Sequence, residues 1–250
     1  PELYAAGHIP GAVEVNWYTE LNHPLRRDVP DREGFEALLR RIGVEQQTTV
    51  VFYGHLHNWM ACNAFWMFLL YGHERVRIMN GGRLKWSQER RELTDEIPEI
   101  EPSVYIAREK DEEGLRIRLF DVLEHWRGGG TILDVRGDEE YRGERLHMHG
   151  FPNDGALRTG RIPKAIDAPW TDAVRLENST FKSREELEEI YLGLHGLDRG
   201  DEIVTYCRVG KRSSHTWFVL TKLLGFENVR SYDGSWLEWG NAIGTPVERG

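Results

Sequence analysis

The residues best suited to covalent chemistry lie in one short segment, residues 206–214. Cys207 stands near its start, and Arg208, Lys211 and Arg212 follow within five positions. Positive charge beside a thiol lowers its pKa from about 8.5 into roughly the 3.5–7.5 range. The spacing therefore predicts that Cys207 is a thiolate nucleophile at neutral pH.

The segment should form a loop between a strand and a helix. Residues 202–206 are apolar enough for a buried parallel strand, and residues 213–224 predict a helix. Ligands bind beyond the carboxyl ends of such strands, where loop N–H groups and the helix N-terminus favour anions. The predicted substrate-binding residues of this loop are Arg208, Val209, Gly210, Lys211 and Arg212.

The distance between cysteine and arginine indicates what the loop can hold. Arg212 comes five residues after Cys207, whereas cysteine phosphatases place the arginine one position later, where this chain has Ser213. A shorter loop makes a tighter cradle, which fits a sulfur atom and is too small for a phosphate. We therefore expect sulfur transfer at this site.

An internal repeat with a constant offset of 153 residues organises the chain. Residues 7–12 return as residues 160–165, and residues 70–86 return as residues 223–239. One register holds over this whole stretch, which indicates a gene duplication. At the same offset Gly54 stands opposite Cys207, so the first copy is expected to lack a nucleophile.

The second copy shows the elements of the repeated unit. Helices are expected at residues 118–126, from Ser183 to Gly196, at residues 213–224 and around Trp236, with strands at residues 132–135, 165–168 and 202–206 and around Val229. Strands that alternate with helices predict an α/β fold. We expect two tandem domains, each a parallel sheet flanked by helices.

The predicted domains are residues 1–90, which are non-catalytic, and residues 117–250, which are catalytic. Residues 91–116 are interpreted as a linker, because they contain prolines and many acidic residues. Counterparts of residues 118–135 would fall before residue 1, so the first domain is expected to lack its opening helix and strand.

The chain resembles the tandem-domain rhodanese family, and its loop is similar to that of bacterial thiosulfate sulfurtransferases. The resemblance rests on the Cys-Arg-x-Gly-x-Arg-Ser loop, the repeated Gly-x-Ile-Pro-x-Ala motif, and residues 133–136 and 234–239. It implies that Cys207 takes the sulfane sulfur of thiosulfate as a persulfide, releases sulfite, and passes the sulfur to a thiophilic acceptor such as cyanide. It also implies that Arg136 holds the sulfonate end of the donor. No cofactor or metal is expected.

Two other readings stay open. The best-known thiosulfate enzymes carry lysine where Val209 stands, and here Lys211 supplies a nearby charge. A 3-mercaptopyruvate sulfurtransferase is one alternative, although that loop usually reads Cys-Gly-Ser-Gly, where this chain has Arg208 and Val209. A persulfide sulfur carrier for a partner enzyme is the other. The physiological donor and acceptor remain open at this stage, as does whether isolated Cys207 carries a persulfide.

Composition restricts the partners and the setting. The net charge is −9, from 32 basic and 41 acidic residues, which disfavours nucleic acid. The longest apolar run, residues 64–71, is too short for a bilayer, and no secretory signal is recognised. Two cysteines, of which Cys62 reads as a buried structural thiol, fit a cytoplasmic protein. The expected partners are a small anionic sulfur donor and a thiophilic acceptor; a monomer is compatible, and the oligomeric state stays open.

Overall fold

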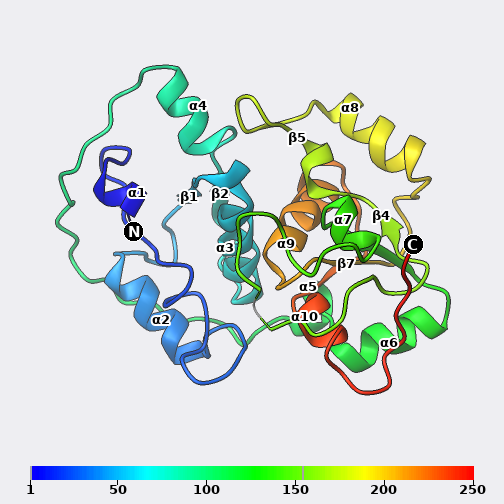
Figure 1. Ribbon diagram of the computed structural model, residues 1–250. Coiled ribbons are helices and arrows are strands. Elements are labelled where there is room, and N and C mark those ends of the chain that lie inside the picture. Colours follow the sequence, from blue (N-terminus) through cyan, green and yellow to red (C-terminus); the bar gives the residue numbers. More distant parts are fainter. Residues whose placement is uncertain (1, 154) are drawn as a thin grey trace. The chain divides into compact units, whose positions relative to one another are not determined.

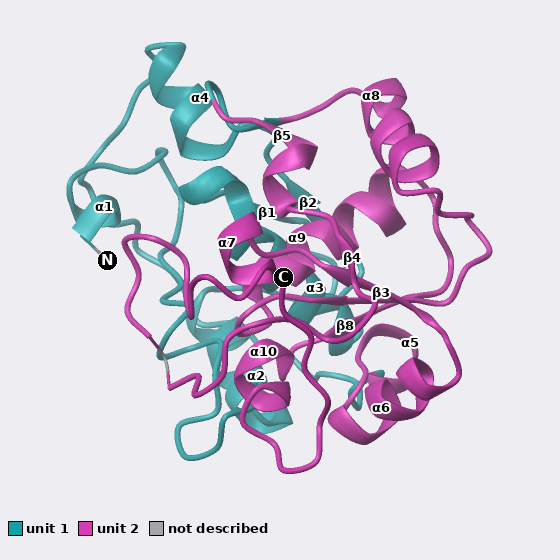
Figure 2. Cartoon of the chain, turned by 45° about the vertical axis from the view of Figure 1, so that its right-hand side comes forward, with its two compact units in different colours: residues 1–111, 177–180 teal, residues 112–176, 181–250 magenta. Residues whose placement is uncertain are grey.

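The computed structural model describes residues 2–153 and 155–250. Two compact units divide the chain: unit 1 is Pro1–Asp111 with Glu177–Thr180, and unit 2 is Glu112–Leu176 with Phe181–Gly250 (Figure 2). Each unit contains parallel strands and flanking helices (Figure 1). The predicted α/β class is therefore confirmed.

The core of unit 2 is a four-stranded parallel sheet in the order β4-β3-β7-β8. These strands are β3 (Thr131–Asp134), β4 (Ile166–Asp167), β7 (Ile203–Tyr206) and β8 (Val229–Tyr232). Every residue of β7 is buried, because β7 lies between β3 and β8 and both faces of the sheet are covered. Its carboxyl end is consequently held on both sides.

The helices of unit 2 follow the predicted alternation. They are α5 (Glu112–Leu115), α6 (Leu119–Arg127), α7 (Asp138–Tyr141), α8 (Arg184–Glu188), η3 (Glu189–Leu194), α9 (Lys211–Phe218), η4 (Val219–Leu223) and α10 (Ser235–Trp239), with a short turn η2 (Trp170–Ala173). Two short strands, β5 (Val174–Arg175) and β6 (Thr180–Phe181), form a separate two-stranded sheet.

Helix α8 begins where the sequence predicts. The Ser183 side chain accepts a hydrogen bond from the Glu186 N–H, and the Glu186 carboxylate accepts one from the Ser183 N–H. Leu187 and Tyr191 are buried on one face of the helix, whereas Leu194 near its end is 77% exposed. The helix continues as the π-helical segment η3, whose wider turn rotates later residues off that face.

Unit 1 contains α1 (Glu2–Ala5), α2 (Arg32–Arg41), β1 (Val50–Phe52), η1 (Leu56–Asn58), α3 (Trp59–Leu70), β2 (Val76–Ile78) and α4 (Gly82–Gln88). Strands β1 and β2 form a two-stranded parallel sheet. Helix α3 is buried along nearly its whole length. Residues 91–111, within the predicted linker, belong to this unit and bury Tyr105 and Ala107.

The repeat predicted from the sequence recurs in the contacts of the two units. Strand β1 pairs with β2 in the register in which β7 pairs with β8, displaced by 153 positions. The Ile9 N–H donates to the Tyr53 hydroxyl at 3.1 Å, and the Ile162 N–H donates to the Tyr206 hydroxyl at the same distance. Such repeated contacts confirm the duplication.

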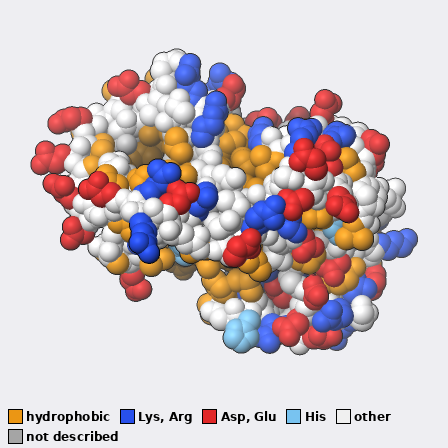
Figure 3. All heavy atoms as spheres, turned by 90° about the horizontal axis from the view of Figure 1, so that it is seen from above, with side chains coloured by type: hydrophobic (Ala, Val, Ile, Leu, Met, Phe, Trp, Pro, Cys, Tyr) orange, Lys and Arg blue, Asp and Glu red, His pale blue; other side chains and the backbone are white. Residues whose placement is uncertain are grey.

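The helices of the described residues are all too short or too polar to cross a bilayer. On the face drawn in Figure 3, acidic and basic side chains are interspersed.

Candidate active site

Cys207 lies directly beyond the carboxyl end of β7 and is almost completely buried. The loop then turns through Gly210, at φ 81°, and enters α9 at Lys211. A side chain at position 210 would also lie 2.7 Å from the Asp233 Cα, closer than atoms of that kind approach. Both the backbone conformation and the close packing therefore require glycine in this loop.

The turn before α10 fixes the backbone of Cys207. The Cys207 N–H donates to the Ser235 hydroxyl at 3.1 Å, and that hydroxyl donates to the Tyr232 carbonyl at 2.6 Å. The Trp236 N–H donates to the Cys207 carbonyl at 3.0 Å. The nucleophile is thus held from both its N–H and its C=O by a turn remote in sequence.

Two opposing effects set the pKa of Cys207. Burial alone would raise the pKa, because it penalises the thiolate. The positive charge of Arg212 and the N–H groups of Ser213 and Val209 outweigh burial, and the pKa of Cys207 is lowered. Cys62, in α3, has no such help, and burial raises its pKa. The geometry therefore favours a reactive thiolate at Cys207 and an inert thiol at Cys62.

Arg212 is itself clamped by Glu140. Two parallel hydrogen bonds, of 2.6 and 2.8 Å, join the guanidinium to the carboxylate, and both side chains are buried. Burial would raise the pKa of Glu140, but Arg212 lowers it below its usual range. Glu140 therefore binds one edge of the Arg212 guanidinium and holds this positive charge near the Cys207 thiolate.

Glu140 was missed from the sequence. It lies in α7, the short helix that follows β3, and it is distant from the Cys207 loop along the chain. The signal that could have found it is the need of a buried arginine for a carboxylate partner. Several acidic residues follow β3, and sequence does not say which of them turns inward.

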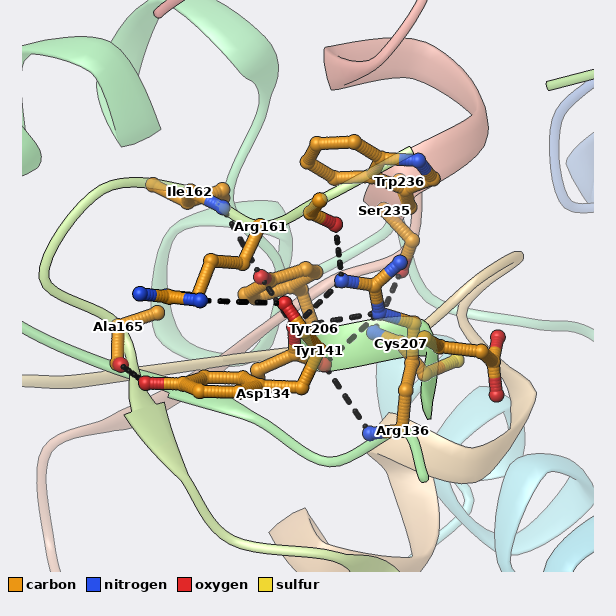
Figure 4. A network of polar contacts seen from close by, with 12 residues as sticks. Asp134, Arg136, Tyr141, Arg161, Ile162, Ala165, Tyr206, Cys207, Ser235 and Trp236 are labelled. Atoms are coloured by element: carbon orange, nitrogen blue, oxygen red, sulfur yellow. Dashed lines mark hydrogen bonds and ion pairs between the residues drawn. The ribbon is translucent and has the colours of Figure 1, made fainter. Parts of the chain in front are cut away.

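Arg136, the residue predicted to hold the sulfonate end of the donor, lies in the interior of unit 2. Its side chain is fully buried, and its guanidinium binds both Asp134 carboxylate oxygens and the Gly160 carbonyl. It also lies 4.7 Å from the Trp236 ring, and the Tyr206 hydroxyl donates to Asp134 at 2.6 Å (Figure 4). That Arg136 holds the donor sulfonate stays a prediction; in this structure the group is enclosed and binds Asp134.

The remaining loop residues divide into buried and partly exposed ones. Arg208 is buried, and its guanidinium donates to the Pro152 carbonyl at 2.9 Å. Pro152 belongs to the irregular stretch before the second Gly-x-Ile-Pro motif. Val209 and Lys211 are partly exposed. Of the predicted binding residues, these two are the ones that the structure places nearest to solvent.

The equivalent loop of unit 1 lacks a nucleophile. Gly54 stands at the position of Cys207, and its N–H donates to the Asn58 side chain at 2.9 Å. Within the described residues, no group of three His, Cys, Asp or Glu side chains is arranged to hold a metal ion. The sulfur-bearing loop of unit 2 is therefore the candidate active site.

Comparison with known proteins identifies the fold family. A model of the rhodanese-like domain matches residues 1–89 and 120–242. The chain belongs to the rhodanese family. The predicted resemblance and the prediction of a rhodanese-type enzyme are thereby confirmed.

Named relatives extend over nearly the whole rhodanese chain. The sulfur carrier protein TtuD of Thermus thermophilus is 48% identical over 99% of this chain and 87% of its own length. A thiosulfate sulfurtransferase of Corynebacterium glutamicum is 46% identical over 99% of this chain and 82% of its own length.

A solved structure shares the same fold. It is a variant of EanB with a cysteine persulfide and ergothioneine, with a TM-score of 0.85 and 25% identity. The match covers 99% of this chain and 62% of the EanB chain, so this chain spans less than two thirds of that protein.

Proposed function

We propose that this rhodanese transfers the sulfane sulfur of thiosulfate to a thiophilic acceptor through a persulfide on Cys207. The observation that supports this proposal most is that Cys207, buried at the end of a central strand, has a lowered pKa. A thiolate in such a loop is a strong nucleophile that needs no separate base. The name of the Corynebacterium glutamicum relative supports thiosulfate as the donor.

The first half-reaction forms the persulfide. The Cys207 thiolate attacks the outer sulfur of thiosulfate, a new S–S bond forms, and the sulfur–sulfur bond of thiosulfate breaks. Sulfite leaves with the electron pair of that bond. The outer sulfur then carries the negative charge, where the charge of Arg212 and the N–H groups of Val209 and Ser213 stabilise it.

The second half-reaction restores the enzyme. An acceptor such as cyanide or a thiolate attacks the outer sulfur, the Cys207 S–S bond breaks, and its electron pair returns to Cys207. The product is thiocyanate or a new persulfide. Sulfur enters and leaves at the same atom, so no oxidant, reductant or cofactor is consumed.

The charges around the loop support an anionic donor. Arg208 and Lys211 carry positive charge on either side of Val209, and Glu140 balances Arg212. We assign donor recognition to the side chains of Arg208, Val209 and Lys211. The backbone N–H groups of the loop, including that of Gly210, contribute as well. Arg136 supports the loop from within. Both cysteines are free thiols, which supports the predicted cytoplasmic setting.

A sulfur carrier is the second candidate function, because TtuD carries that name at 48% identity. A carrier also needs the Cys207 persulfide and differs only in passing the sulfur to a protein. In that case, small acceptors should discharge the persulfide slowly.

The experiment compares two donors and one acceptor. Sulfite release from thiosulfate and pyruvate release from 3-mercaptopyruvate are measured with cyanide as acceptor. We expect the larger kcat/KM for thiosulfate. A clear preference for mercaptopyruvate would overturn the proposed donor, and persulfide formation without turnover on cyanide would favour the carrier.

A further inference from the structure

The end of the predicted linker forms part of the catalytic unit. After helix α5, Arg116 pairs with Ser231 of β8 as an isolated parallel bridge, and the Ile117 N–H donates to the Ser231 carbonyl at 3.2 Å. The sheet of unit 2 therefore gains a short parallel edge beside β8. This places the Arg116 side chain next to the turn that follows β8.

Arg116 is joined to that turn by a two-point ion pair. Its Nε and Nη2 atoms donate to the two carboxylate oxygens of Asp233 at 3.0 and 2.8 Å. Arg116 is only 5% exposed, so the pair is shielded from solvent. A bidentate arginine–carboxylate pair fixes orientation as well as distance.

Asp233 belongs to the turn that holds the active loop. The close approach of the Asp233 backbone to Gly210, described above, supports the loop on one side. Two residues beyond Asp233, the Ser235 hydroxyl accepts the Cys207 N–H. The turn thus contacts the active loop at two points, the Asp233 backbone and the Ser235 hydroxyl, and Arg116 binds the side chain of Asp233.

We propose that Arg116 is a positioning residue for Cys207, acting through Asp233 and the turn at residues 232–235. Arg116 lies three residues before α6 begins at Leu119, and it precedes Cys207 by 91 positions along the chain. The inference rests on the proposed role of Cys207 as nucleophile.

The chain offers a matched control in Arg118. Its guanidinium binds Glu112 at 2.7 to 3.0 Å, the carboxylate that Arg116 also approaches at 3.4 Å, but it is half-exposed. Arg116→Gln and Arg118→Gln remove the same charge two positions apart. Only the first removes the ion pair with Asp233.

The test is the rate at which iodoacetamide alkylates Cys207, measured against pH in a Cys62→Ser background. Loss of a charged hydrogen-bonded contact in Arg116→Gln should slow alkylation at neutral pH by about tenfold and lower kcat more than it raises KM. Arg116→Lys should recover part of the rate. Arg118→Gln should alkylate at the parent rate.

Equal alkylation of folded Arg116→Gln and Arg118→Gln would overturn the proposal. If Arg116→Gln does not fold, Arg116→Lys and Asp233→Asn carry the same comparison, and parent-like rates in both would overturn it. Alkylation does not depend on sulfur transfer. If the parent protein is alkylated normally but transfers no sulfur, the proposed function fails. The alkylation rates of Arg116→Gln and Arg118→Gln still test the role of Arg116.

Discussion

The reactivity of Cys207 depends on its pKa, which burial raises and nearby positive charge and N–H groups lower. A thiol enclosed in protein resists ionisation, as Cys62 shows. Arg212 and two loop N–H groups reverse this for Cys207. Because Glu140 holds Arg212 in place, the charge stays near the sulfur. These contacts favour the thiolate of Cys207 although the residue is buried.

The lowered pKa of Cys207 predicts the pH dependence of its reactivity. Only the thiolate reacts with iodoacetamide, so the rate should rise with pH and level off once the thiol is ionised. Since the pKa is lowered, the midpoint should lie below that of a free cysteine, about 8.5. The rate is measured in Cys62→Ser protein, with free cysteine as the reference. A midpoint at or above the reference would contradict the assigned role of Arg212.

Arg136 is predicted to act on stability more than on donor binding. Arg136→Gln leaves Asp134 buried without its partner, and breaking a buried pair costs about 3–5 kcal/mol. Urea unfolding should show this loss, whereas Arg127→Gln, at an exposed pair with Glu124, should cost less than about 1 kcal/mol. Unchanged stability together with a raised KM for thiosulfate would instead return Arg136 to a donor-binding role.

Among the elements, the strand–loop–helix unit of β7 and α9 determines where the nucleophile lies. The buried strand fixes the start of the loop, and the helix fixes its end. Between them, Gly210 has to adopt a positive φ beside the Asp233 backbone. The loop therefore tolerates little change at this position.

The loop geometry predicts a sharp contrast between two glycines. Gly210→Ala imposes a left-handed conformation on alanine, at a cost of about 1–2 kcal/mol, in addition to the clash with Asp233. We expect at least about a tenfold loss of kcat/KM. Gly193→Ala, in η3 with open space around it, should leave activity unchanged and stabilise by up to about 1 kcal/mol. Equal activities of the two variants would contradict the need for glycine in the loop.

The elements themselves could be predicted because each has a local signal. The apolar run at β7 predicted a strand, and Ser183 predicted the start of a helix. The repeated motifs indicated the duplication. The partners of the charged groups could not be predicted in this way. Glu140 reaches Arg212, and Ser235 reaches Cys207, across long sequence distances. The motif around Arg136 likewise does not reveal that Asp134, two residues earlier, binds its guanidinium.

At the scale of the whole molecule, duplication has left two similar units with different chemistry. Unit 1 keeps the strand, the loop and the tyrosine contact, but Gly54 replaces the nucleophile and Asn58 binds its N–H. Each unit contains one cysteine, Cys62 in α3 of unit 1 and Cys207 in unit 2. We therefore propose that a single residue, Cys207 of unit 2, carries the sulfur chemistry.

The most direct test of this assignment is the intact mass of the protein after incubation with thiosulfate and removal of excess donor. We predict that the parent protein and Cys62→Ser each gain the mass of one sulfur atom and lose it when cyanide is added, while Cys207→Ser gains none. A sulfur atom that is still acquired by Cys207→Ser and passed on to cyanide would contradict the mechanism.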